Sequence, residues 1–213
     1  MNKETLIDIE KRHRPDDIDV GWTDKNGRTY AGTGDKGTGH NYIESYENLF
    51  KDIRYDAKNI FEIGVCGGYS LRMWKEYFPN AMIYGADVNV ECLDHNEDRI
   101  KVFHMDATNQ RIIMDNFSKI NYGDIRFDVI IDDGSHQMTD QRSSFMSLYP
   151  YLSDNGIYVI EDVSLTAGRN YPNEPDVNVE YYKSFHRDTE IIDLRSINNR
   201  WDDILVVIRK GVK

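Results

Sequence analysis

Short apolar runs alternate with longer polar segments over most of the chain. Several of these runs are rich in Val, Ile and Phe, residues that favour strands. The first five runs are spaced so that a helix and its loops fit between them, which is typical of βαβ units around a buried parallel sheet. We therefore expect strands at Ile60–Val65, Met82–Ala86, Lys101–His104, Phe127–Ile131, Gly156–Ile160, Glu190–Leu194 and Ile204–Arg209.

Three of the polar segments carry apolar residues at three- and four-residue steps, as amphipathic helices do. They are Ser70–Phe78, Asn109–Lys119 and Thr139–Tyr151. Only Ser196–Asp203 separates the last two strands, too few residues for a parallel crossover, so we expect an antiparallel hairpin there. The predicted fold class is α/β, a Rossmann-like, mostly parallel sheet of seven strands with a C-terminal antiparallel hairpin. This layout resembles the class I S-adenosylmethionine (SAM) methyltransferases.

The length of 213 residues fits one main domain. We expect an N-terminal arm over residues 1–30 and the methyltransferase-like domain over residues 31–213. A lid-like insertion is expected at about residues 164–187, because this stretch lacks a clear period. The arm is either flexible or part of a partner surface, and the insertion is either a lid over the acceptor site or a variable surface segment.

The charge balance narrows the range of partners. The chain has 26 Lys and Arg against 37 Asp and Glu, a net charge of −11, so it repels nucleic-acid backbones and anionic membranes. No apolar run reaches the ~18–20 residues that a membrane span needs. Two cysteines, Cys66 and Cys92, are too few for a disulfide framework or a zinc cluster. We expect a cytoplasmic protein with no nucleic-acid partner, and we leave a homo-oligomer open.

A turn rich in glycine follows the first predicted strand. It reads Gly64-Val65-Cys66-Gly67-Gly68. Glycine lets the backbone approach a ligand that lies over the strand ends. A dinucleotide fingerprint needs glycine at its third position, where this chain has Cys66, so that motif is absent. The alternative is a tight turn that only packs a helix on a strand.

Carboxylates end the next two predicted strands. Asp87 lies 23 residues after Gly64, where an acidic side chain accepts hydrogen bonds from ribose hydroxyls. Asp106 follows the third strand, where adenine is usually approached, and its alternative role is a helix N-cap. Sites at three successive strand ends favour a nucleoside cofactor. The absence of a phosphate-binding turn favours SAM over NAD.

Two acidic pairs follow the fourth and fifth strands. The first is Asp132-Asp133, with His136 three residues on, and the second is Glu161-Asp162. Carboxyl ends of neighbouring strands meet at one edge of a sheet, so these side chains are expected to converge. Clustered carboxylates repel one another unless a cation compensates them, and oxygen ligands suit Mg²⁺. His136 is then a natural general base. The alternative is a pair of solvent-facing helix caps.

These motifs together resemble one family. Asp-Asp-Gly-Ser-His, followed 25 residues after the histidine by Glu-Asp, resembles the metal-dependent sugar O-methyltransferases of macrolide biosynthesis, the mycinamicin and tylosin type. The wider group includes sequences named cephalosporin hydroxylases. The resemblance covers roughly Thr33–Ser164, and Gly34–Tyr42 is similar to the family's Asp-Lys…His-x-Tyr stretch.

The resemblance also implies roles for individual residues. It implies that Asp133, Glu161 and Asp162 ligate Mg²⁺ and that His136, beside Asp133, is the catalytic base. It further implies that SAM is bound by residues of the upstream stretch, the glycine turn and the strand ends: Asp35, Lys36, Tyr42, Glu62, Gly64, Gly67, Asp87, Asp106 and Asp132.

The expected function is therefore SAM- and Mg²⁺-dependent O-methylation of a sugar or of a small molecule that carries one. Two adjacent hydroxyls would chelate the metal, which lowers the pKa of the bound oxygen, and His136 would remove its proton. Two alternatives stay open. One is a methyltransferase for a catechol-like or other polar acceptor. The other is a non-catalytic SAM-binding partner subunit.

Overall fold

The computed structural model describes residues 4–14, 22–23, 27, 29–30, 34–120, 123–166 and 175–211. The chain falls into two compact units, Met1–His104 and Met105–Lys213, and each is described by itself. Parts of the predicted arm (residues 15–21, 24–26 and 28) and of the predicted insertion (residues 167–174) lie outside the described residues. None of the described helices is long and apolar enough to cross a membrane.

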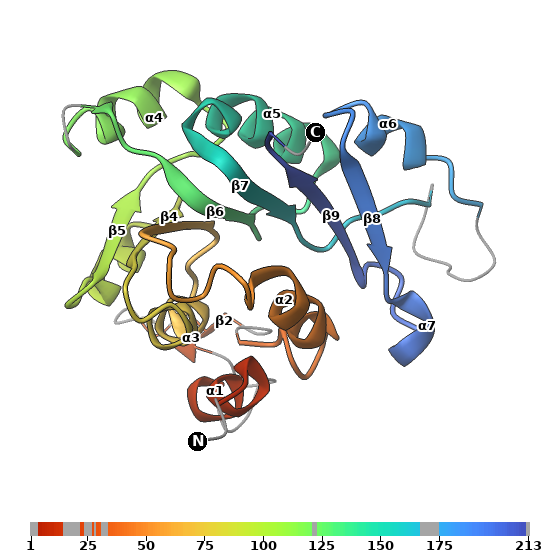
Figure 1. Cartoon of the computed structure of the whole chain (residues 1–213), viewed down its shortest axis with the longest axis horizontal. Helices are drawn as coiled ribbons and strands as arrows, with labels where there is room; N and C mark the ends of the chain where they lie inside the picture. The colour runs from red at the N-terminus through yellow and green to blue at the C-terminus, as the bar shows by residue number, and fades with distance from the viewer. Residues whose placement is uncertain are drawn as a thin grey trace. The chain divides into compact units, whose positions relative to one another are not determined.

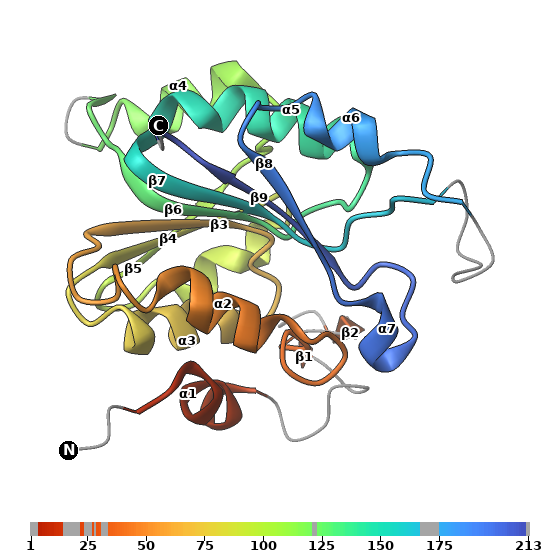
Figure 2. The same cartoon turned by 45° about the vertical axis from the view of Figure 1, so that its right-hand side comes forward.

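The first unit is built on a parallel set of strands in the order β5-β4-β3. Figure 2 shows α2 and α3 against the same face of these strands, with α1 beyond them. The strands are β3 (Asn59–Ile63), β4 (Met82–Asp87) and β5 (Ile100–His104). The antiparallel pair β1 (Trp22–Thr23) and β2 (Thr29–Tyr30) forms a separate two-stranded sheet. The helices are α1 (Leu6–His13), α2 (Tyr42–Phe50), α3 (Tyr69–Tyr77) and the 3₁₀ helix η1 (Val90–His95).

Aromatic packing holds these helices on the strands. Trp74 of α3 is fully buried, and its ring centroid lies 5.2 Å from that of Tyr46 and 5.9 Å from that of Phe50, both on α2. A Cβ added to Gly85 of β4 would lie 2.7 Å from a Val65 methyl carbon, so glycine is needed for this close approach. The packing brings the start of α3 and the turn before it onto the end of β4.

The second unit carries strands in the order β6-β7-β9-β8. β6 and β7 are parallel, whereas β9 is antiparallel to both β7 and β8. Helices α4, α5 and α6 lie over one face of these strands (Figure 1). The strands are β6 (Phe127–Asp132), β7 (Leu152–Ile160), β8 (Thr189–Asp193) and β9 (Ile204–Arg209). The helices are α4 (Gln110–Phe117), α5 (Met138–Leu148), α6 (Val179–Lys183), α7 (Arg195–Asn198) and the 3₁₀ helix η3 (Tyr149–Tyr151).

The predicted fold class is confirmed. The described strands have the order β5-β4-β3-β6-β7-β9-β8, mostly parallel, and β8 and β9 pair antiparallel as expected. The sequence did not predict that β9 lies between β7 and β8. Burial explains this position, because Ile204–Ile208 of β9 are all fully buried while no residue of β8 is. The continuous apolar run belongs inside the sheet, and β8, which has Thr and Glu before its two isoleucines and Asp after them, forms the edge.

Four of the described α-helices were not anticipated from the sequence, namely α1, α2, α6 and α7. α1 lies in the predicted arm, where Thr5 caps it with a capping box and Leu6 and Ile9 are fully buried. It packs against α2 and α3. α2 follows the Gly34–Tyr42 stretch. The described part of the arm is thus a packed helix, stabilised by tertiary contacts more than by its own short length.

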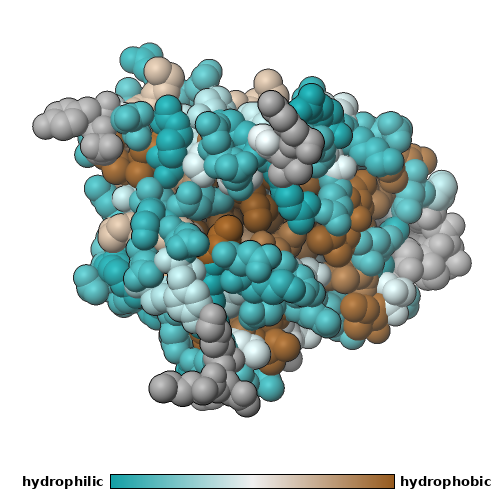
Figure 3. Space-filling view, viewed as in Figure 1, coloured by the Kyte–Doolittle hydropathy of each residue, from teal (hydrophilic) through white to brown (hydrophobic). Residues whose placement is uncertain are grey.

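The surface facing the viewer in Figure 3 is mostly hydrophilic, in line with the charged composition, and hydrophobic residues show between the polar ones. The exposed large hydrophobic residues of the second unit are spread over α4, α5, α7 and the segment before α6: Met114, Met146, Ile197 and Val177. Single exposed apolar residues of this kind are normal on a protein surface.

Candidate active site

The glycine turn after β3 has an unusual backbone. Gly64, Cys66 and Gly68 have φ values of +89°, +42° and +69°, in the left-handed region. Such a φ is easy for glycine and strained for cysteine. The turn is held from β4 by Asp87, whose Oδ2 accepts the backbone N–H groups of Val65 at 2.9 Å and Cys66 at 3.1 Å. Asp87 therefore fixes the turn, in addition to the ribose role predicted for it.

His95, at the end of η1, holds the same turn. Its Nε2 donates to the Cys66 carbonyl at 2.9 Å, and Nδ1 lies 3.5 Å from an Arg72 nitrogen. Burial, together with the positive charge of Arg72, lowers the pKa of His95, so the ring is neutral with its proton on Nε2. A Cβ added to Gly68 would lie 2.9 Å from the His95 ring, which explains the glycine. No local pattern in the sequence predicts this contact.

The Gly34–Tyr42 stretch reaches the interior of the first unit through Lys36. Its Nζ lies 3.4 Å from Oε1 of Glu62, which is fully buried, and the Trp74 indole donates to Oε2 of Glu62 at 2.6 Å. His40 stacks on Tyr42 with ring centroids 4.6 Å apart. Lys36 and Glu62 thus form a buried ion pair, and their predicted contacts with SAM stay predictions.

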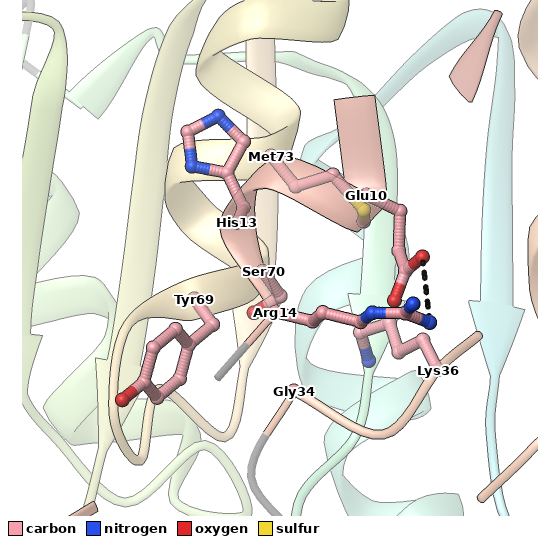
Figure 4. Close-up of a pocket in the computed structure, with 8 residues that line it drawn as sticks. All are labelled: Glu10, His13, Arg14, Gly34, Lys36, Tyr69, Ser70 and Met73. Carbon is pink, nitrogen blue, oxygen red and sulfur yellow. Dashed lines mark ion pairs between the residues drawn. The ribbon is translucent and has the colours of Figure 1, made fainter. Parts of the chain in front are cut away.

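A small hollow borders the start of α3. Figure 4 shows Arg14 and Lys36 extending toward Glu10, while Tyr69 points away from them. Arg14 and Glu10 form an ion pair at 3.9 Å, and burial raises the pKa of the Glu10 carboxyl. Residues of the predicted arm and of the Gly34–Tyr42 stretch both line this hollow, within the first unit.

Asp106 is the first candidate site residue of the second unit in chain order. Its Oδ1 accepts the backbone N–H of Thr108 at 2.9 Å and the Thr108 hydroxyl at 2.7 Å. The N-cap of α4 is Asn109, whose side chain accepts from two backbone N–H groups of the helix. Asp106 therefore stabilises the turn before the helix and is not its N-cap, and its predicted contact with adenine stays a prediction.

The structure brings Asp133, His136 and Asp162 together. One ligand atom from each lies within 4.8 Å of the others. His136 Nε2 is 3.4 Å from Asp133 Oδ1, and Nδ1 is 3.1 Å from Asp162 Oδ2. Burial opposes protonation, but the bond to Asp133 and the charges of Asp133, Asp162 and Glu161 raise the pKa of His136 to about 9. The imidazolium then supplies the positive charge that these carboxylates require.

The backbone of this cluster is also strained. His136 and Asp162 have φ values of +59° and +52°, and with Cys66 they are three of the six non-glycine residues in the described chain that have such values. Each one costs on the order of 1–3 kcal/mol and persists only where its surroundings enforce it. Strain of this kind is concentrated at functional sites, which supports both candidate regions.

Asp132 and Glu161 stand next to the cluster. Both are 2% exposed. Asp132 accepts the Gly134 N–H at 3.3 Å, and burial raises its pKa to about 7. Among the described residues, the ligand atoms that converge are those of Asp133, His136 and Asp162, and Glu161 is not one of this group. The carboxylates of Asp133 and Asp162 fit a magnesium ion, which prefers oxygen ligands, and the predicted roles of Asp132 and Glu161 stay predictions.

Hydrogen bonds join the start of the predicted insertion to residues farther along it. Asn178 donates from its backbone to the Leu165 carbonyl at 2.9 Å and from its side chain to those of Ser164 at 3.1 Å and Thr166 at 3.2 Å. Arg195 makes a bidentate ion pair with Asp176, at 2.9 and 3.0 Å. These bonds hold Asp176 and Asn178, which lie inside the insertion, to Arg195 and to the start of the insertion, and its role as a lid stays a prediction.

Comparison with known proteins identifies relatives. No protein-family model matches the chain. The chain is 38% identical over 131 residues to mycinamicin VI 2''-O-methyltransferase of Micromonospora griseorubida, which covers 58% of this chain and 32% of that relative. It is 37% identical over 131 residues to the 8-demethyl-8-alpha-L-rhamnosyl tetracenomycin-C 2'-O-methyltransferase of Streptomyces olivaceus, over 58% and 33% of the two. The chain is thus similar in sequence to these O-methyltransferases.

A solved structure extends this relationship to the fold. The MycE methyltransferase of the mycinamycin pathway, in complex with Mg, SAH and mycinamycin VI, matches with a TM-score of 0.69 and 25% identity over 99% of this chain and 54% of that one. The relationship confirms the resemblance that the motifs indicated. The chain spans about a third of the curated relatives' length and about half of the solved structure.

Proposed function

We propose that the protein is an O-methyltransferase that uses SAM and Mg²⁺ to methylate a hydroxyl of a sugar-bearing small molecule. One observation carries the proposal, the convergence of Asp133, His136 and Asp162 on strained backbone at the end of β6 and β7. Support comes from the relatives, which are named as O-methyltransferases of sugar-bearing antibiotics, and from MycE, which binds Mg and SAH.

The second unit would hold the metal and the acceptor. Asp133 and Asp162 provide carboxylate oxygens for Mg²⁺, with Glu161 as a third ligand on the strength of the resemblance. When bound, Mg²⁺ lowers the pKa of a coordinated hydroxyl. The two acids also orient the base, because each ring nitrogen of His136 faces one of them.

His136 would then move the proton. In its neutral form, which the positive charge of a bound Mg²⁺ would favour over the imidazolium, it would accept the proton of the acceptor hydroxyl at Nε2, while Asp162 faces Nδ1 and would stabilise the resulting cation. The hydroxyl oxygen would then attack the methyl carbon of SAM in line, forming a C–O bond as the methyl–sulfur bond breaks and S-adenosylhomocysteine leaves. The protein's main contributions are the position of the acceptor and the acceptance of its proton.

The first unit would bind the methyl donor. SAM supplies an electrophilic methyl group on its sulfonium. The backbone of the glycine turn is fixed by Asp87 and His95, so the turn is preorganised for a ligand over the strand ends. Asp87 already accepts the backbone N–H groups of Val65, Cys66 and Asn89, which leaves about one of the four acceptor positions of a carboxylate for a ribose hydroxyl.

Calorimetric titration with SAM and, separately, with Mg²⁺ tests this assignment. Asp87→Ala is expected to lose SAM binding only, and Asp133→Asn to lose Mg²⁺ binding only. The matched controls are Asp98→Asn in the first unit and Asp154→Asn in the second, both at exposed acids. If the wild-type chain binds neither ligand, the proposal fails.

Methyl transfer itself is tested by mass spectrometry with glycosylated polyketide acceptors, SAM and Mg²⁺. The expected product carries one added methyl group, and its formation stops when Mg²⁺ is chelated. Methylation of a catechol and of no sugar acceptor would replace the proposed substrate class. The cytoplasmic location, the lack of a nucleic-acid partner and the oligomeric state stay predictions.

A further inference from the structure

A buried line of hydrogen bonds runs from α6 through α5 to the end of β7. The Tyr182 hydroxyl donates to Oε1 of Gln141 at 2.8 Å, and Nε2 of Gln141 donates to the Glu161 carbonyl at 3.0 Å. Tyr182 is fully buried and Gln141 is 2% exposed. Because the tyrosine donates to the oxygen end of the amide, its nitrogen end is fixed toward Glu161.

The Glu161 carbonyl belongs to the planar peptide unit that joins Glu161 to Asp162. A planar peptide can turn only if ψ of the residue before it and φ of the residue after it change together. Asp162 has φ of +52°, so turning this peptide over would return Asp162 to an ordinary negative φ and relieve its strain. Such a turn would also move the carbonyl away from Gln141.

The neighbouring peptide is fixed as well. The Glu161 N–H donates to the Asp132 carbonyl at the end of β6, at 2.9 Å. Relaxation is therefore confined to the peptide that Gln141 holds. Asp162 follows this peptide directly, and its Oδ2 is 3.1 Å from His136 Nδ1.

We propose that Gln141 is a positioning residue for the acidic cluster. It holds the Glu161–Asp162 peptide in the orientation that keeps Asp162 at a positive φ beside His136 and Asp133, and Tyr182 sets the orientation of the Gln141 amide. The consequence for metal binding rests on the proposed function, whereas the consequence for the backbone does not.

A role in packing alone would favour an apolar residue here. Burying an amide costs free energy unless its groups are hydrogen-bonded, and an apolar side chain of equal size avoids that cost. Gln141 bonds at both ends, and its nitrogen bonds to the one carbonyl whose direction decides φ of Asp162.

The test uses Gln141→Met, which keeps the length of the side chain and removes the donor, and Tyr182→Phe, which removes only the hydroxyl. Ser144→Ala, at another buried position of α5, is the matched control. Mg²⁺ and SAM are titrated separately, at a temperature where circular dichroism shows every variant folded. Crystal structures of the wild type and of Gln141→Met, grown without metal, give φ of Asp162.

Gln141→Met is expected to weaken Mg²⁺ binding by about 10- to 100-fold, as changes beside metal ligands typically do. A few-fold loss is expected for Tyr182→Phe and none for Ser144→Ala, with SAM affinity unchanged throughout. In the crystal structure, Asp162 is expected to have a negative φ.

Asp162 at its wild-type φ in Gln141→Met, with its carboxylate still facing His136, would overturn the inference. Should Gln141→Met fail to fold, a Tyr182→Phe variant that binds Mg²⁺ as the wild type does would overturn it too. A wild-type chain that binds no Mg²⁺ contradicts the proposed function, and the crystal structures then still decide the role of Gln141.

Discussion

His95 and His136, one in each candidate region, have pKa values shifted in opposite directions. In the glycine turn, burial beside Arg72 lowers the pKa of His95, and the neutral ring serves as a hydrogen-bond donor to the backbone. In the acidic cluster, neighbouring carboxylates raise the pKa of His136 to about 9. The hydrogen bonds of the glycine turn are thus made by groups of the protein itself, the neutral His95 ring and the Asp87 carboxylate. The cluster balances its charge only with a bound proton or another cation.

The largest expected effect comes from the histidine of the acidic cluster. His136→Ala removes the proposed base, so kcat is expected to fall by about 10²–10⁴-fold, the usual contribution of a general base. SAM affinity, which the proposal assigns to the first unit, should not change. Steady-state kinetics with calorimetric SAM titration checks both. Turnover equal to that of the wild type would remove His136 from the mechanism.

The first unit is expected to respond through stability. Lys36→Met leaves the Glu62 carboxylate buried without its ion-pair partner and is expected to reduce the free energy of unfolding by about 3–5 kcal/mol. Urea denaturation measures the loss. The double variant Lys36→Met, Glu62→Gln is the control, because it removes both charges and should recover part of the stability. A Lys36→Met protein as stable as the wild type would show that Glu62 does not depend on this pair.

Metal addition separates the two regions directly. Mg²⁺ at 100 times its Kd is expected to raise the free energy of unfolding by about 2.7 kcal/mol, since it binds only the folded chain. Asp133→Asn should abolish this stabilisation and leave the stabilisation by SAM unchanged. Thermal unfolding with and without each ligand measures both effects. If Mg²⁺ stabilises Asp133→Asn as strongly as the wild type, the cluster is not where the metal binds.

The smallest expected effect is the pH dependence that His95 contributes. Its pKa is lowered in the folded chain from the ordinary value of 6.5, so the unfolded chain binds more protons as the pH falls below that value. The stability linked to His95 is therefore present above about pH 6.5. It is lost as the pH falls through the folded pKa.

His95→Gln checks this contribution, because glutamine keeps a donor for the Cys66 carbonyl and does not titrate. The slope of unfolding free energy against pH below 6.5 is expected to decrease in this variant. A slope identical to that of the wild type would contradict the neutral state assigned to His95.

The elements that the sequence predicted well depend on local patterns. Apolar runs marked every strand of the main sheet, and the Asp-Asp-Gly-Ser-His motif marked the residues that converge around His136. α1 was missed although Thr5 and Asp8 form a capping box, because its eight residues are too few to show a clear helical period and are stabilised by packing on α2 and α3. The place of β9 depends on which of two apolar runs is buried on both faces.

The missed site residues act across long stretches of sequence. His95 bonds to Cys66 29 residues earlier, and Tyr182 bonds to Gln141 41 residues earlier. A buried glutamine or histidine has no local signature of such a contact, because its partners are backbone carbonyls that every residue possesses. Only the fold shows which carbonyl each side chain reaches.

The position of β9 has a consequence for how the chain is made. On the ribosome, β8 emerges before β9, yet β9 is the strand beside which β8 pairs at the edge of the described sheet. A nascent chain that has reached Asp193 therefore has β8 without its partner and a bare edge on β7. The final strand inserts between two strands already synthesised, so this part of the second unit closes only after Ile204–Arg209 has left the exit tunnel.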